Sequence, residues 1–361
     1  MRTRAFWPIA AALLLACHGS GGTGGGGGTG GGGAGGGGGG GAGGGGAGGA
    51  GGGGGTATGF TVGGCPVFAT SYAYNVDISQ APVDANSSTY LAALTQAAPT
   101  IGVDYPGGEM YNVVPASQPM VAVQTSAYYG WDASGTFFFA NNGAGAMAPI
   151  PTNVVYENMG VANQDHHMMV VQQGSCRLYE MYAWNPTSAT AGWEALVAWD
   201  LNAADQQIPD NLETGSTTAA GTPLLPGVIW PEEVAAGVIR HAVDIVMPAG
   251  AIAKCKYMHP ASSGSWTATG AFPYGGRLRL KASYDLSKLS GTQAKVVLRA
   301  LMQYGMINTD ISGETRSSFR LGGLGSNQGW DMQDILQLAQ LTWDDFEVVD
   351  GGTVYSMKGC Q

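Results

Sequence analysis

The chain is poor in charged residues, and positive charge is the scarcer kind. Asp, Glu, Lys and Arg make up 11% of its 361 residues, whereas a typical globular domain has about 25%. The 15 Lys and Arg residues face 25 Asp and Glu residues, which gives a formal net charge of −10. Because such a chain repels phosphate backbones, we expect no nucleic-acid partner.

Several catalytic and membrane-spanning signatures are missing as well. The sequence has no G-x-S-x-G nucleophile elbow and no phosphate-binding P-loop. Its N-terminal apolar run, Ala5 to Ala16, has only 12 residues. A helix of that length is too short to cross a hydrocarbon core about 30 Å thick. A transmembrane anchor is therefore the weaker interpretation of this run.

The N-terminus has the features of an export signal. Arg2 and Arg4 precede the apolar run, which ends at Cys17, and this order is typical of a secretory signal peptide. The ending Leu14-Leu15-Ala16-Cys17 resembles the lipobox of bacterial lipoproteins. That resemblance implies a signal over residues 1–17, a lipid on Cys17 and attachment to a membrane. With His18 next, it favours the outer membrane of a Gram-negative bacterium. An ordinary secretory signal cut nearby is the alternative.

A glycine-rich segment separates this signal from the rest of the chain. Between residues 21 and 55 the sequence contains 29 glycines, and the remaining positions are Thr or Ala. Such a segment has almost no side chains to bury, so nothing offsets the entropy lost on folding. We therefore predict a disordered linker over 18–59 and a single β-rich extracytoplasmic domain over 60–361.

Four cysteines remain for this domain if Cys17 carries lipid. They are Cys65, Cys176, Cys255 and Cys360. An even number in an exported protein indicates two disulfides, with three connectivities open. Zinc binding is the alternative, but no pair has the close spacing of structural zinc ligands.

Short apolar or alternating runs separated by Gly, Pro, Asn and Asp predict a mainly β fold. Strands are expected at 120–125, 136–139, 154–157, 167–172, 177–182, 195–201, 242–247, 277–284 and 346–349. A capping box at Ser290–Gln293 predicts a helix that Gly305 ends. Further helices are expected from Ser88, Pro231 and Asp331. This pattern favours an antiparallel sandwich, jelly-roll-like, or a barrel, with a few peripheral helices and a disordered linker in front.

Two neighbouring motifs resemble a known signature. Asp165–Val171 and Cys176–Glu180 match the pattern D-x-H-x-x-V-V…C-x-L-Y-E, which is similar to a widespread, functionally uncharacterised family of secreted bacterial proteins. The resemblance continues through Asn75–Ser79, Leu225–Gly227, Glu233–Ala242, Arg279–Ala282, Tyr304–Ile307 with Asp310, and Phe346–Asp350. It covers nearly the whole domain and implies a shared fold without assigning an activity.

The chain departs from this family pattern in two loops. Glu213–Thr218 replaces a tryptophan-rich stretch before Leu225–Gly227, and Asp310–Gly313 replaces a D-N-G sequence. A family site that uses either loop would therefore be altered in this chain.

Histidines and carboxylates supply the candidate chemistry. His167, Glu180 and His241 could converge on neighbouring strands, with Asp165 or Asp310 in support. Such a set could perform acid–base catalysis without a cofactor, or it could hold a divalent metal. The favoured interpretation is plainer: His167 and Glu180 form a buried hydrogen-bonded pair that holds the sheet together. We therefore expect no cofactor and treat metal binding as a minor alternative.

Other side chains favour ligand binding. Tyr182 and Trp184 belong to an aromatic cluster that could stack against sugar rings. Arg277, Arg279 and Lys281 would share one strand face and could clamp an acidic saccharide.

The sequence leads us to expect a lipid-anchored surface protein that recognises a polysaccharide or another envelope or environmental ligand. A carbohydrate-active hydrolase or lyase using His167, Glu180 and His241 is the alternative. A structural envelope protein without a small ligand is the second alternative.

Overall fold

The computed structural model describes residues 59–104, 108–125, 129–131, 137–139, 146–161, 164–183, 192–193, 195–204, 206–208, 216–323 and 329–360. The predicted signal peptide with Cys17, the predicted linker up to residue 58 and Trp184 lie outside the described residues. Within the described part, no helix has both the length and the apolar character needed to cross a membrane.

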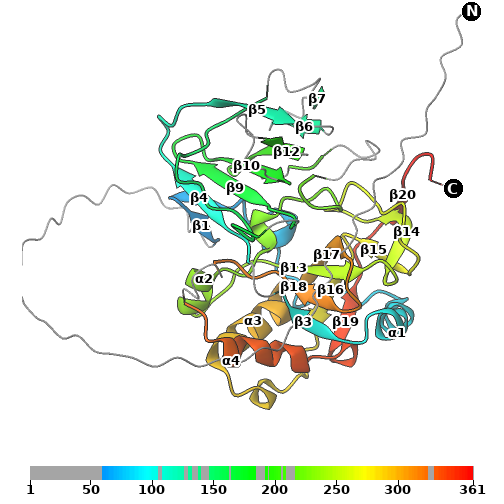
Figure 1. The fold of residues 1–361 in the computed structure, drawn as a ribbon. Helices are drawn as coiled ribbons and strands as arrows, with labels where there is room; N and C mark the ends of the chain where they lie inside the picture. The colour runs from blue at the N-terminus through cyan, green and yellow to red at the C-terminus, as the bar shows by residue number, and fades with distance from the viewer. Residues whose placement is uncertain are drawn as a thin grey trace, which may run out of the picture.

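The strands form two halves, one above the other in Figure 1. The first half is built on a six-stranded sheet in the order β4 (Tyr111–Val114), β9 (Met168–Gln172), β10 (Arg177–Tyr182), β12 (Ala195–Asp200), β6 (Tyr129–Trp131) and β7 (Phe137–Phe139). It also holds the sheet β11 (Gly192–Trp193), β5 (Val121–Thr125) and β8 (Ala146–Ala148), and the pair β1 (Thr61–Val62) and β2 (Cys65–Pro66).

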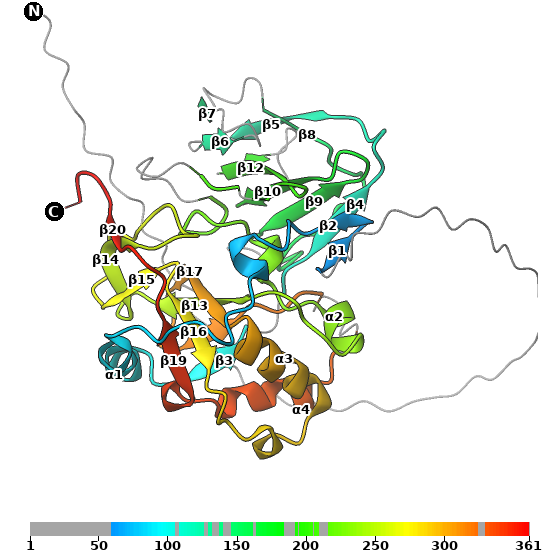
Figure 2. The ribbon, with the colours of Figure 1, turned by 180° about the vertical axis from the view of Figure 1, so that it is seen from behind.

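The second half contains another six-stranded sheet and most of the helices, as the reverse view in Figure 2 also shows. The sheet order is β19 (Phe346–Val349), β16 (Arg277–Leu280), β17 (Met306–Ser312), β13 (Val243–Pro248), β18 (Ser317–Phe319) and β3 (Ile101–Val103). A smaller sheet contains β15 (Phe272–Tyr274), β14 (Ile252–Tyr257) and β20 (Tyr355–Ser356).

The helices of the described residues are short. They are α1 (Ser87–Ala97), α2 (Pro231–Ala235), α3 (Thr292–Gln303), α4 (Met332–Ile335) and the 3₁₀ helices η1 (Ala73–Asn75), η2 (Leu225–Gly227), η3 (Leu286–Lys288), η5 (Leu336–Gln340) and η6 (Trp343–Asp345). The mainly β class with a few peripheral helices is therefore confirmed.

The two halves are interlocked along the chain. β3 pairs with β18 in the second sheet, and the next strand, β4, pairs with β9 in the first. Both of these pairs are parallel, as is the pair β13–β17. The two large sheets are thus mixed, because they contain parallel pairs, which need a long crossover connection, beside antiparallel ones.

Most of the predicted strands form, but two runs behave differently. The run 154–157 is not a strand, because the side-chain amide of Asn112 takes over its backbone: Val155 N–H donates to Asn112 Oδ1 at 2.9 Å, and Asn112 Nδ2 donates to Val155 O at 2.8 Å. The run 277–284 stops at Leu280, since a turn closes between Lys281 and Tyr284.

Helix α3 begins at Thr292 but not with the predicted capping box. Its N-cap is Gly291, which offers no side chain. The carboxylate of Asp334 in α4 accepts instead from Gln293 N–H at 2.8 Å and Ala294 N–H at 3.0 Å. Gly305 follows the helix at φ +72°, as the sequence predicts.

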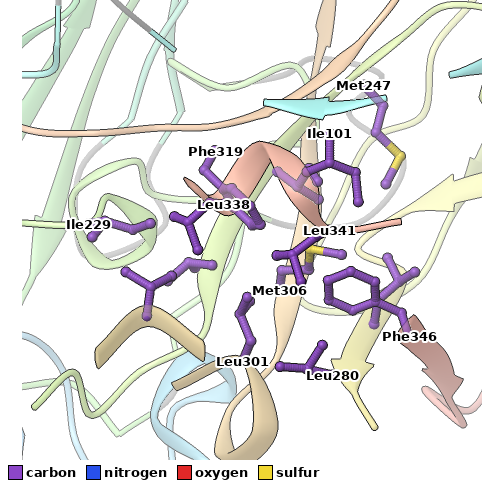
Figure 3. Packing of buried hydrophobic residues seen from close by; sticks show 14 of the residues in the cluster. Ile101, Ile229, Met247, Leu280, Leu301, Met306, Phe319, Leu338, Leu341 and Phe346 are labelled. Carbon is purple, nitrogen blue, oxygen red and sulfur yellow. The ribbon is translucent and has the colours of Figure 1, made fainter. Parts of the chain in front are cut away.

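The main hydrophobic core lies between the second sheet and its helices. In Figure 3, side chains from β3, β17, β18, α3 and η5 meet around Ile101, Met306 and Phe319. All three are at most 2% exposed, and burying each side chain of this kind contributes about 1.5–3 kcal/mol. A second cluster joins β9, β10 and β12 to Tyr74 and Ile307, so apolar packing continues across the junction of the halves.

Two disulfides link distant parts of the chain. Cys65 pairs with Cys176 at a Cα–Cα distance of 5.3 Å, and Cys255 pairs with Cys360 at 5.9 Å. Both distances are normal for a disulfide. The prediction that these four cysteines form disulfides is confirmed, and the connectivity left open by the sequence is now defined. Because disulfides persist in oxidising compartments, they indicate an extracytoplasmic protein.

Candidate functional site

A cluster of buried charged side chains lies where the two halves meet. Glu109 stands just before β4, and its backbone N–H donates to Leu321 O at 2.8 Å, which places it beside Arg320 at the end of β18. Glu157 lies next to His167, because its N–H donates to His167 O at 2.9 Å. Neighbouring backbones of both halves therefore bring these four side chains together.

His167 is the centre of this cluster and is almost fully buried. Its Nδ1 lies 2.7 Å from Glu157 Oε2 and 3.8 Å from Glu109 Oε1, and its Nε2 donates to Thr217 O at 2.9 Å. An imidazole with acceptors at both nitrogens is best satisfied when both carry protons. Burial alone would lower its pKa, but Glu109 and Glu157 raise the pKa of His167 to about 10.

Arg320 links the two halves by two ion pairs. Its Nη1 donates to Glu109 Oε1 and its Nη2 to Asp310 Oδ2 on β17, both at 2.5 Å. Charge-assisted bonds of this kind are the stronger class of hydrogen bond. Asp310 also accepts from Ala219 N–H at 3.2 Å, which fixes the segment before η2 onto the second sheet.

The carboxylates of the cluster differ in their affinity for protons. Burial and the nearby charge of Glu157 raise the pKa of Glu109 to about 7. Burial would also raise the pKa of Glu157, but the adjacent His167 lowers it to about 2. Glu157 is thus the ionised partner of His167, whereas Glu109 holds a proton more readily than Glu157 does.

Glu180 is a second buried carboxylate, close to the cluster but separate from it. It accepts four hydrogen bonds, from Trp199 Nε1 at 2.9 Å, Thr217 Oγ1 at 3.1 Å, and the N–H groups of Leu224 and Leu225, both at 2.8 Å. Burial raises the pKa of Glu180 to about 7 against the effect of these four donors.

His167 and Glu180 are joined through Thr217 and do not bond to each other. Thr217 accepts from His167 with its carbonyl and donates to Glu180 with its hydroxyl. Thr217 therefore forms a buried bridge between two of the predicted residues.

His241 is placed apart from these two. Its Nε2 lies 2.9 Å from Glu233 Oε2, and its Nδ1 donates to Ala242 O at 2.8 Å. His167, Glu180 and His241 therefore do not form a common metal or catalytic set. Among the described residues, the potential metal ligands that do come together are Glu109, Glu157 and His167.

The other predicted site residues border the cluster. Tyr182 donates to Asp165 Oδ1 at 3.3 Å, and its ring centroid lies 5.3 Å from that of His167. Asp310 holds Arg320, as described above, and burial raises its pKa. Asp165, Tyr182 and Asp310 thus lie close to His167, whereas His241, which was expected to converge with His167, pairs with Glu233.

The predicted basic clamp is used inside the fold. Arg277 donates to Ala73 O and to Tyr304 O, both at 2.8 Å. Arg279 pairs with Glu347 at 2.5 Å, and Lys281 donates to Asp344 O at 2.6 Å. These three side chains hold chain segments against β16.

A cavity of about 320 Å³ opens at the junction of the halves. It is lined by Tyr72, Ala73, Gln206, Gln207, His259 and Pro260. Gln206 and Gln207 follow β12 in the first half, whereas His259 and Pro260 follow β14 in the second. Arg277 supports one wall through its bond to Ala73 O.

The lining combines amide groups with flat apolar surfaces. Gln207 and His259 are hydrogen-bonded to each other across the cavity wall. The His259 ring also packs edge-on to Tyr355, with centroids 4.8 Å apart. The Tyr72 ring stacks on Phe68 at 4.1 Å, which fixes the opposite wall. The site is thus held in place before any ligand binds.

Comparison with known proteins gave no match: no family model, no curated protein and no solved structure matches the chain.

Sequence reasoning missed the residues that complete the buried cluster. Glu157 was assigned to a strand, and Glu109 and Arg320 were not considered. One signal was present: Arg320 lies between Phe319 and Leu321 in a chain with few basic residues. An arginine within an apolar run usually has a buried acidic partner.

Proposed function

We propose that this protein is a lipid-anchored surface protein whose extracytoplasmic head binds a polysaccharide in the cavity formed by Tyr72, Ala73, Gln206, Gln207, His259 and Pro260. The lipid would be carried by Cys17 and would hold the protein at the outer membrane of a Gram-negative bacterium. The glycine-rich stretch would act as the tether.

The chemistry of the cavity lining is the observation that carries the binding proposal. The amides of Gln206 and Gln207, which bond to Asp200 N–H and to His259, are groups that can both donate and accept, as saccharide hydroxyls require. His259 and Pro260 offer surfaces on which the C–H groups of a sugar ring can pack. A volume of about 320 Å³ is at the small end of ligand pockets, which suits one sugar unit of a longer chain.

The lining also favours a neutral saccharide over an acidic one. Among the described residues, those that line the cavity include no Lys, Arg, Asp or Glu. The basic residues that could have clamped an acidic sugar, Arg277, Arg279 and Lys281, are engaged within the fold.

The hydrolase or lyase alternative lacks comparable support. A general base needs to reach the proton that it removes. His167 and Glu180 are nearly inaccessible, and their polar atoms are already bonded to protein groups.

A polysaccharide panel tests the proposal. Purified protein is run through native gels containing β-glucan, galactomannan, xylan or the acidic pectin, and the same samples are assayed for new reducing ends. We expect retardation in at least one neutral polymer without product release. Migration unchanged in all gels would contradict binding, and product release would establish an enzyme.

The lipid anchor has its own test. Cells expressing the full chain are labelled with radioactive palmitate, and the membrane and soluble fractions are compared. We expect the wild type to carry the label. The Cys17→Ser variant should lose the label and be released from the membrane. Equal membrane attachment of both proteins would contradict the anchor.

A further inference from the structure

The buried cluster contains a set of ligand atoms at metal-binding separations. One nitrogen of His167 and one carboxylate oxygen each from Glu109 and Glu157 lie within 4.8 Å of one another. All three residues are buried. An imidazole with two carboxylates is a donor set that suits Zn²⁺ and other divalent first-row metals.

A second observation concerns the free oxygen of Glu109. Its Oε1 accepts from Arg320, but its Oε2 is buried and has no hydrogen-bond donor among the described residues. A buried acceptor without a partner costs about 1–3 kcal/mol. The oxygen that lies 3.8 Å from His167 Nδ1 is Oε1, so a cation held by the Glu109 carboxylate would share it with Arg320 and would also offer a partner to the carboxylate's second oxygen.

His167 is oriented as a metal ligand would be. Its Nε2 donates to Thr217 O, which directs Nδ1 toward the two glutamates. Metal-bound histidines commonly donate their second N–H to a backbone carbonyl, because this fixes the ring and the tautomer.

The charges of the cluster leave room for a divalent cation. With neutral imidazole, the three carboxylates of Glu109, Glu157 and Asp310 outweigh Arg320 by two charges. The Arg320 charge is shared between Glu109 and Asp310, so it does not occupy the space beside Glu157. Asp310 also interacts electrostatically with His167 and with the exposed Asp165.

We propose that Glu109, Glu157 and His167 bind a divalent first-row metal ion, with Zn²⁺ as the representative, and that this ion fastens the segment between β3 and β4 to the first half of the head. On binding, the lone pair of His167 Nδ1 bonds to the metal, and the proton on that atom leaves to solvent. The ion connects the segment before β4, the turn at Glu157 and the start of β9.

Zinc titration of the chelator-treated full-length protein tests this site. We expect one Zn²⁺ per chain in calorimetry and, at a hundredfold excess over Kd, a rise in Tm of roughly 5 °C or more. Glu109→Gln and Glu157→Gln should each weaken binding by about tenfold or more. Glu233→Gln is the matched control, because it alters the other buried His–Glu pair, and it should bind Zn²⁺ like the wild type.

Failure to bind Zn²⁺ would overturn the proposal, and so would equal binding by all of the variants. X-ray absorption of the wild-type zinc protein identifies the types of zinc ligand, so the proposal can be tested even if a variant does not fold. We expect one imidazole and otherwise oxygen ligands. Two or more imidazoles, or a sulfur ligand, would place the metal elsewhere and overturn the proposal.

Discussion

At the scale of single residues, Glu180 has an environment that only a carboxylate satisfies well. All four of its partners are donors. In Glu180→Gln the new amide NH₂ would face at least one of these donors at close range. We expect a loss of about 1–3 kcal/mol in the free energy of unfolding, measured by urea denaturation.

Glu314→Gln is the control for this substitution. Glu314 is exposed and pairs with the half-buried Arg316, so its loss should change stability by less than about 0.5 kcal/mol. Equal effects of the two substitutions would show that the hydrogen bonds of Glu180 do not stabilise the fold.

The buried acids make stability depend on pH. Burial raises the pKa of Asp244 to about 7, as it does for Glu109 and Glu180. The folded chain therefore binds more protons than the unfolded chain between about pH 4 and pH 7, and stability falls as pH rises through this window. The raised pKa of His167 acts in the same direction, since its contribution is complete below about pH 6.5 and is lost toward pH 10.

We therefore expect a higher Tm at about pH 5.5 than at about pH 8.5. Scanning calorimetry of the wild type and of Asp244→Asn measures this difference. The substitution removes one of the raised carboxyl groups, so the Tm of the variant should depend less on pH. A wild-type Tm that rises from the acidic to the basic buffer would contradict the argument.

At the scale of elements, the N-terminus of α3 is capped by a side chain from another helix, α4. Asp334→Ala removes the acceptor for Gln293 N–H and Ala294 N–H. We expect a loss of about 1–2 kcal/mol, the usual range for removing an N-cap. Ser290→Ala should have little effect, because Ser290 is not the N-cap. Chemical denaturation of both variants measures the two losses. A larger loss for Ser290→Ala than for Asp334→Ala would support the predicted capping box instead.

These elements show which parts of the fold the sequence could predict. Strands and helices followed from local periodicity, and Gly305 ended α3 where a left-handed residue was expected. The cap by Asp334 and the side-chain pairing of Asn112 with Val155 could not be foreseen. Both join residues about 40 positions apart, and local patterns carry no information about such contacts.

In the candidate site, too, local patterns predicted some features, whereas contacts between distant residues could not be predicted. The motif around His167 correctly pointed to a buried polar pair, but its ionic partner is Glu157 rather than Glu180. Arg320 and Glu109 meet across the junction of the halves, more than 200 positions apart in sequence. The residues that line the cavity have no shared motif, so only the folded chain brings them together.

At the scale of the whole molecule, the disulfides hold distant parts of the fold. Cys65–Cys176 and Cys255–Cys360 close loops with sequence separations of 111 and 105 residues. Loops of this length lose much conformational entropy when cross-linked, so removing either disulfide by a Cys→Ser pair should cost about 2–5 kcal/mol. Urea denaturation of the two double variants measures the loss. Stability unchanged in both would contradict a stabilising role.

The account as a whole depends on binding at the cavity between the halves. The most direct measurement is the calorimetric affinity for an oligosaccharide of the polymer that retards the protein, compared between wild type, Gln207→Ala and the exposed α4 control Gln333→Ala. Because a hydrogen bond to a ligand contributes about 0.5–1.5 kcal/mol, we predict an affinity about two- to tenfold weaker for Gln207→Ala and unchanged for Gln333→Ala. Equal affinity of all three proteins would contradict the account.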